Sequence, residues 1–149
     1  MPFKSEPVLV PSIVMSDLAI VEQGTGKRSI IGSFDQFIFP QFPATYGRFF
    51  LTAWVSNMAG TFSALEATFR VEEKGSAHVV FSSSTNITFS TETTFDKDLI
   101  MALSAPIIGM SFPKPGLYTI VLLLAGERIG ERDFNVLQAP APQPPAPQP

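Results

Sequence analysis

The sequence contains no cysteine and a single histidine, His78. Without cysteine, a disulfide framework and cysteine-ligated zinc or iron–sulfur centres are excluded. One histidine cannot supply a multi-histidine metal site or a two-histidine facial triad. A chain of 149 residues can be stable without a disulfide or a bound metal, because it buries roughly two thirds of its unfolded surface. We therefore expect no cofactor, and we expect His78 to be an ordinary strand residue.

Charge is also scarce, since charged residues make up 15% of the chain against about 25% in typical globular domains. The net charge of −3 gives no electrostatic reason to expect nucleic acid. The apolar runs are far shorter than the roughly 20 residues of a membrane helix, and the N-terminus lacks the pattern of a signal peptide. We expect a cytoplasmic protein. Its excess of apolar residues either fills the core or meets a protein partner or a second copy.

Alternating apolar and polar residues predict β-strands. Residues 49–56 and 63–72 alternate in this way, and the second segment has one dry and one wet face. Residues 117–124 are almost all apolar, which is typical of a central strand, and residues 132–137 alternate again. No segment of 12 residues shows helical periodicity with caps.

Glycine and proline mark the turns between these segments. We expect turns at 24–27, 58–60, 73–76, 113–116 and 125–128. Strands at short spacing, separated by turns, predict an all-β fold: an antiparallel β-sandwich of about seven to nine strands, immunoglobulin-like or C2-like.

The chain divides into an N-terminal arm (1–10), the sandwich domain (11–138) and a proline-rich tail (139–149). Proline fixes the backbone and removes donors, so we expect an extended polyproline II tail about 34 Å long. Pro142 with Pro145, and Pro144 with Pro147, give the proline-x-x-proline spacing of segments that dock on aromatic grooves. A simple spacer is equally consistent with this composition.

Several stretches together resemble a family of small bacterial proteins known only as a domain of unknown function. They are residues 17–21, 24–27, 31–35, 42–43, 112–118 and 126–132. The resemblance covers roughly residues 12–137 and implies a β-sandwich, but no activity, cofactor or catalytic residue. The element Pro115-Gly116-Leu117-Tyr118 is also similar to one found in many immunoglobulin-like sandwiches.

Motifs that resemble catalytic or metal sites have simpler interpretations. Residues 24–27 lack the spacing of a phosphate loop, so we interpret them as a hairpin. The serine-rich run 82–85 has no neighbouring base or elbow motif, and we expect an exposed strand end. The candidate ligands for a hard metal are Asp17, Asp35, Asp96 and Asp98. Calcium binding would require Asp35, Asp96 and Asp98 to converge on one loop end. We expect no enzyme activity.

Aromatic residues gather in one segment that is interleaved with prolines. Its members are Phe34, Phe37, Phe39, Phe42 and Tyr46. Aromatic side chains serve as interface anchors, and proline lowers the entropy lost on docking. The segment either forms such an interface, which Trp54 would extend, or crosses between the sheets and plugs the core.

These features favour a non-catalytic structural or interaction subunit. It would dock into a larger assembly through the aromatic–proline segment and the polyproline tail. The alternative is a C2-like ligand-binding module for calcium, a lipid headgroup or a carbohydrate.

Overall fold

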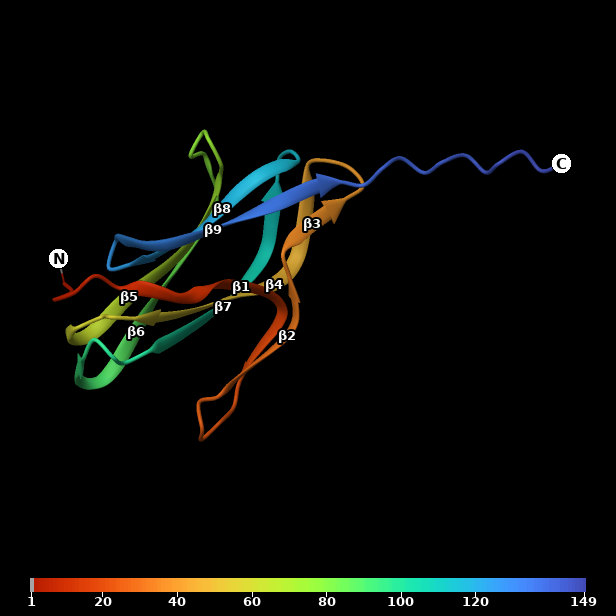
Figure 1. Cartoon of the computed structure of the whole chain (residues 1–149). Coiled ribbons are helices and arrows are strands. Elements are labelled where there is room, and N and C mark those ends of the chain that lie inside the picture. The colour runs from red at the N-terminus through yellow and green to blue at the C-terminus, as the bar shows by residue number, and fades with distance from the viewer. Residues whose placement is uncertain (1) are drawn as a thin grey trace.

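The computed structural model describes residues 2–149, which form two curled β-sheets and no helix (Figure 1). The strands are β1 (Val8–Val21), β2 (Arg28–Phe34), β3 (Gln36–Phe39), β4 (Ala44–Ser56), β5 (Gly60–Glu73), β6 (Val79–Phe95), β7 (Met101–Phe112), β8 (Gly116–Leu124) and β9 (Glu127–Gln138). The all-β expectation is confirmed. No helix within residues 2–149 has the length and apolar character to cross a membrane.

The first sheet has the order β2-β1-β4-β7 and the second has the order β3-β9-β8-β5-β6. Every pairing is antiparallel except that of β3 with β9, which is parallel. The expectation of a wholly antiparallel fold is therefore wrong at this edge. The reason is the connection: β2 ends at Phe34 and β3 begins at Gln36, so the chain changes sheet within one residue and then runs alongside β9.

The alternation in the sequence matches the burial of the strands. On β5, Leu65, Ala67, Phe69 and Val71 are buried and contribute to the core, as expected. The expected central strand is β8, which lies between β9 and β5 and buries residues 118–122 in succession. Residues from both sheets form one hydrophobic cluster.

The turns lie where glycine and proline predict them. The hairpin at 24–27 is confirmed, because Val21 pairs with Arg28 and Glu22 N donates to Lys27 O at 2.7 Å. Gly24 and Gly26 have φ of +91° and +70°, backbone angles that residues other than glycine rarely adopt.

The two ends of the chain behave differently. Phe3 is buried, its ring centroid lies 5.4 Å from that of Phe62, and Ser5 Oγ donates to Asn57 O at 2.6 Å. Residues 3–7 thus pack against the turn between β4 and β5, and β1 begins inside the expected arm. At the other end, Ala139 N donates to Phe39 O at 2.8 Å, and the exposed residues 140–149 extend away from the body (Figure 1).

Phe37 on β3 is the centre of an aromatic cluster between the sheets. Only 3% of its surface is exposed. Its ring centroid lies 4.9–6.0 Å from those of Phe34, Phe39, Tyr46, Phe49, Phe112 and Phe134. These rings come from both sheets, so the short β3 strand holds the two sheets together through Phe37.

We expect Phe37→Ala to lower the free energy of unfolding by about 3–5 kcal/mol, because it leaves a cavity among six rings. Denaturant unfolding measures this change. Ile38→Ala is the matched control: its side chain is 56% exposed, and the expected cost is within about 0.5 kcal/mol. Equal effects of the two substitutions would contradict the assignment of Phe37 to the core.

Candidate functional site

A groove separates β6 from β7. Each is the last strand of its sheet, and no pairing joins them within residues 2–149. The space between them is a cavity of about 520 Å³. Its lining comes from four strands: Arg28 of β2; Ala67 and Phe69 of β5; Ser83, Ser84, Thr85 and Ile87 of β6; and residues 102–106 of β7. We call this feature the β6–β7 groove.

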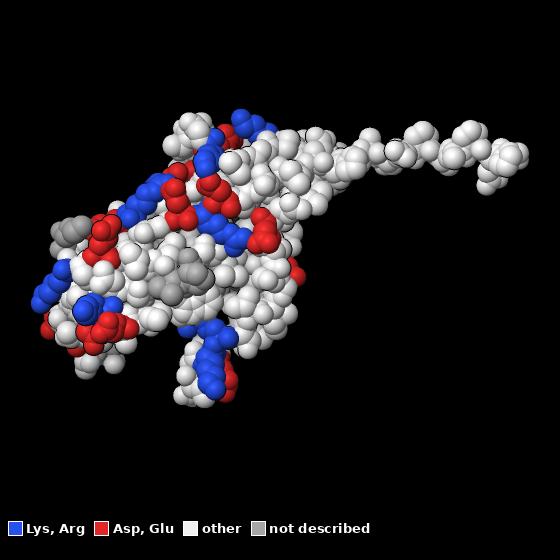
Figure 2. Space-filling model, in the orientation of Figure 1, with Lys and Arg blue, Asp and Glu red and all other residues white. Residues whose placement is uncertain are grey.

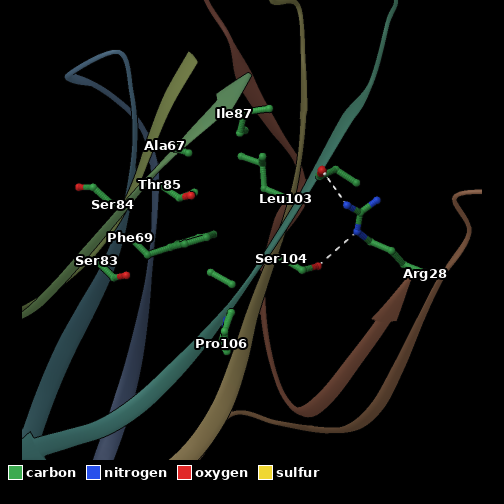
Figure 3. A pocket seen from close by; sticks show the side chains of 12 residues that line it. Arg28, Ala67, Phe69, Ser83, Ser84, Thr85, Ile87, Leu103, Ser104 and Pro106 are labelled. Carbon is green, nitrogen blue, oxygen red and sulfur yellow. Dashed lines mark hydrogen bonds between the residues drawn. The ribbon is translucent and has the colours of Figure 1, made fainter. Parts of the chain in front are cut away.

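The groove has an apolar floor and a wall of hydroxyl groups. Phe69 and Leu103 point into the space between the strands (Figure 3) and are 3% and 8% exposed. Ser83 pairs with Phe69 and Thr85 pairs with Ala67, so both hydroxyls lie on the face of β6 that is turned toward this floor. Such a lining suits a ligand that is mainly apolar and carries a few polar groups.

The serine-rich run 82–85 was expected at an exposed strand end; three of its four residues are exposed, but its place at a strand end is wrong. The run lies inside β6 and pairs with β5. It contains no glycine or proline to end the strand, and its last residue, Thr85, favours extended structure. No catalytic motif in the sequence points to the role of this run in lining the groove. The one available signal was a long run without turn residues.

Arg28 is the one charged residue in the lining. Its Nε donates to Ser104 Oγ at 3.2 Å and its Nη2 donates to Ala102 O at 3.0 Å (Figure 3). Ser104 Oγ also lies 3.1 Å from Thr52 Oγ1. Within residues 2–149 Arg28 forms no ion pair, so the groove has positive character.

Pro106 and a hydrogen bond from Arg28 block part of the free edge of β7. Pro106 lies in β7 opposite Phe50, and a proline in a strand turns its nitrogen away from the neighbouring strand because it has no hydrogen to donate. The N–H and C=O groups of successive residues point to opposite edges of a strand. Those of Ala102 and Ser104 therefore point to the same free edge as the nitrogen of Pro106. The bond from Arg28 to Ala102 O agrees with this direction.

The aromatic segment mainly fills the core. Phe37 is buried, while the other four members, Phe34, Phe39, Phe42 and Tyr46, are half-buried and pack against the core. Burial excludes Phe37 as a contact residue. Partner binding by the other four, and by the half-buried Trp54, stays a prediction.

The tail prolines predicted to bind a partner are all exposed. They are Pro142, Pro144, Pro145 and Pro147, and none of them belongs to a strand.

The acidic residues considered for calcium do not converge. Asp35 forms an ion pair with Arg132. Asp96 Oδ1 accepts hydrogen bonds from Asp98 N at 2.9 Å and from Leu99 N at 3.0 Å, as in an ordinary turn. Across residues 2–149 no group of three or more His, Cys, Asp or Glu side chains could hold a metal ion.

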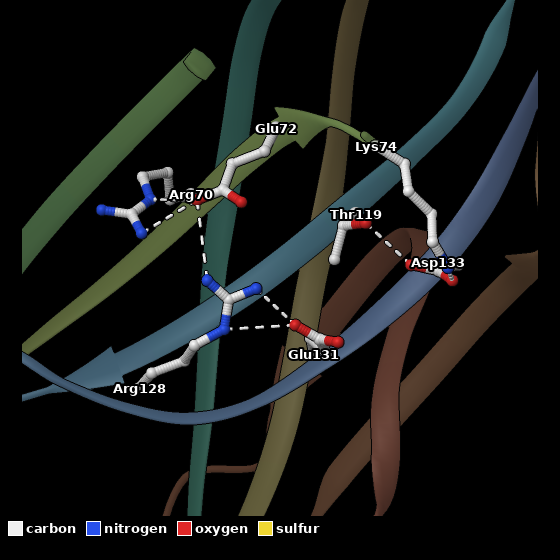
Figure 4. A network of polar contacts seen from close by, with 7 residues as sticks. All are labelled: Arg70, Glu72, Lys74, Thr119, Arg128, Glu131 and Asp133. Atoms are coloured by element: carbon white, nitrogen blue, oxygen red, sulfur yellow. Dashed lines mark hydrogen bonds and ion pairs between the residues drawn. The ribbon is translucent and has the colours of Figure 1, made fainter. Parts of the chain in front are cut away.

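Opposite charges pair across β5, β8 and β9 (Figure 4). Arg70 contacts Glu72 at 2.9 Å, and Arg128 bridges Glu72 and Glu131. Figure 2 shows the resulting band of mixed charge, and a tail that carries none. These side chains satisfy one another, which is typical of a solvated strand face.

Asp133 is part of the same face. The hydrogen bond from Lys74, and then that from Thr119 Oγ1 at 2.7 Å, hold the pKa of its carboxyl below the ordinary value of 3.8. A general acid needs the opposite shift, toward neutrality. The shift of the Asp133 pKa is thus opposite to the one that a general acid needs.

A carboxyl whose pKa is lowered in the folded state stabilises the fold at pH values above its ordinary pKa. This stabilisation is lost as the pH falls through the pKa of the folded state. We expect Asp133→Asn to cost less than about 1 kcal/mol at pH 7, since solvent screens the pair. The difference from the unsubstituted chain should shrink below about pH 4. Urea unfolding at pH 7 and pH 2.5 tests this, with Asp98→Asn as the control for charge removal. A difference that is equal at both pH values contradicts it.

The chain belongs to DUF6941, a family of unknown function, whose model matches residues 11–137. This confirms the resemblance to an uncharacterised family. No curated protein matches the chain.

Two solved structures illustrate a distant similarity. A Pseudomonas fluorescens alkylpurine DNA glycosylase, AlkC, bound to DNA with an abasic site analogue, is 13% identical with a TM-score of 0.42. The match covers 86% of this chain and 31% of the glycosylase. A Listeria innocua β-glucosidase in complex with isofagomine is 9% identical with a TM-score of 0.39, over 90% of this chain and 16% of the enzyme. The chain thus spans less than a third of each protein, and similarity at this level carries no functional argument.

Proposed function

We propose that the protein is a non-catalytic structural or interaction subunit that docks into a larger protein assembly. The observation that carries the proposal is the β6–β7 groove, where two sheet edges lie unpaired beside an apolar floor. Unpaired strand edges are the sites at which proteins add extended segments of a partner. The paired charges lie on β5 and β9, in the sheet that ends at β6, and they keep that part of the surface polar and less suited to the same role.

The exposed tail supplies a second contact in this proposal. Residues 140–149 make no strand pairing and project from the body (Figure 1). Their prolines already restrict the backbone, so the tail loses little conformational entropy when a partner binds it. The half-buried aromatic residues around Phe37 and the side chain of Trp54 extend the contact surface. The assembly lies in the cytoplasm of a bacterial cell.

Within the proposal the fold is an immunoglobulin-like sandwich. Tyr118, near the start of β8, donates from its hydroxyl to Lys114 O at 2.6 Å. A tyrosine near the start of a strand that bonds back to the backbone a few residues upstream is typical of immunoglobulin-like sandwiches.

A ligand-binding module is the second candidate. The volume of the groove, about 520 Å³, lies within the roughly 300–1,000 Å³ of small-molecule sites, and its hydroxyl groups suit a carbohydrate or a lipid headgroup. The calcium version has no convergent carboxylates to support it within residues 2–149.

The test compares native complexes isolated from the source cells through a tagged full-length chain and a tagged chain that ends at Gln138. We expect the full chain to sediment with a partner of fixed stoichiometry and the shortened chain to lose most of it. Native mass spectrometry reads both results. A bare monomer in both samples contradicts the proposal.

A further inference from the structure

We propose that the β6–β7 groove accepts an extended acidic segment of a partner protein, which pairs with β6 as an added strand and places a carboxylate at Arg28. This inference rests on the proposed interaction function and names the chemistry of the partner. It follows from three features of the groove: the unprotected edge of β6, the apolar floor and the single charge.

β6 has the least protected edge among the four edge strands. β3 has only four residues, and β2 begins with the charged Arg28. β7 contains Pro106 and has a carbonyl capped by Arg28. Short length, proline and charge are the usual means by which proteins block pairing at an edge.

The regular part of β6 has none of these means. Residues 81–88 pair in unbroken register with 64–71 of β5, and the register shifts lie on either side of this run. The run contains no proline and no charged residue. Every second residue of an edge strand turns its N–H and C=O away from the sheet, so this run offers a ladder of backbone donors and acceptors to a new strand.

The floor of the groove suits one face of such a strand. An added strand on β6 turns alternate side chains inward, toward Phe69, Leu103 and Ile87, which line the groove. Backbone hydrogen bonds then supply affinity, and the inward side chains supply specificity. A small molecule would use the floor and leave the backbone edge unpaired, so the arrangement favours a peptide.

Charge selects the kind of peptide. Arg28 is the one charged residue of the lining and has no carboxylate partner within residues 2–149. Two of its nitrogens bind Ser104 Oγ and Ala102 O, while Nη1 makes no hydrogen bond to any described residue. A carboxylate on the incoming segment is complementary to this guanidinium.

The chain itself does not provide the segment. Its tail has proline at six of the eleven positions 139–149, and proline cannot donate to a strand ladder. A second copy that pairs through its own residues 81–88 brings no carboxylate, because that run has none. The occupant is therefore a segment of a different protein.

The experiment selects a phage-displayed library of random nine-residue peptides against the full-length chain. Thr85→Phe fills the groove from an exposed position, and Asn86→Phe is its matched control because Asn86 is exposed and does not line the groove. We expect the selected peptides to share one acidic position, to bind the Asn86→Phe variant normally, and to lose at least about tenfold in affinity with Thr85→Phe.

A double-mutant cycle then tests the charge contact. Replacing the acidic residue of a selected peptide by its amide should weaken binding to the unsubstituted chain at least about tenfold, and should have little effect with Arg28→Gln. Arg28→Lys should keep part of the preference, and Ser104→Ala, which removes one hydrogen bond of Arg28 and no charge, should keep it all.

The outcomes separate this inference from the function on which it rests. Peptides that bind in the groove without an acidic preference overturn the charge claim and leave the interaction function in place. Peptides that bind the Thr85→Phe variant equally well, or a library without binders, overturn the groove as a strand site. A dimer of the isolated chain that Thr85→Phe abolishes shows a second copy as the occupant and overturns the choice of partner.

Discussion

The packing of Phe37 between the two sheets is the interaction on which the rest of the structure depends. The chain leaves the first sheet at Phe34 and enters the second at Gln36, so one side of the molecule is closed by the chain and by the aromatic rings around Phe37. On the other side, β6 and β7 also follow one another in the sequence, but no pairing joins them within residues 2–149. The two sheets are thus closed where they end at β2 and β3, and open where they end at β7 and β6.

The distribution of charge follows the same division. Arginine, lysine and carboxylate side chains pair across β5, β8 and β9 and keep that face hydrated. The groove on the open side contains only Arg28, whose hydrogen bonds go to Ser104 and Ala102 of β7. Ion pairs therefore gather on β5 and β9, whereas the open side combines apolar surface with unpaired backbone within residues 2–149.

Much of the fold was predictable because local rules decide it. Period-two alternation located β4 and β5, and glycine located the hairpin between β1 and β2. The parallel pairing of β3 was not predictable, since it depends on where the chain crosses between sheets rather than on any local pattern. For the aromatic segment the sequence allowed both an interface and a core plug. Only tertiary packing showed that Phe37 is buried.

The groove was harder to predict than the strands. Ser83 and Thr85 look like exposed residues in the sequence, and Phe69 and Leu103 look like ordinary core residues. What makes them a site is the absence of pairing between β6 and β7 in the described chain. A single sequence does not show whether two consecutive strands pair with each other or belong to different sheets. Arg28 was equally hidden, because it lies beside a hairpin turn more than 70 residues from its partners in β7.

Amide hydrogen exchange in the isolated chain, followed residue by residue by NMR, tests the central claim most directly. If β6 and β7 are open edges, alternate amides within residues 81–88 and 102–105 should exchange rapidly, while the amides between them, bonded to β5 and β4, should be protected. Uniform protection along both runs would contradict the account, because it would mean that the two strands pair with each other or with a second copy and leave no groove.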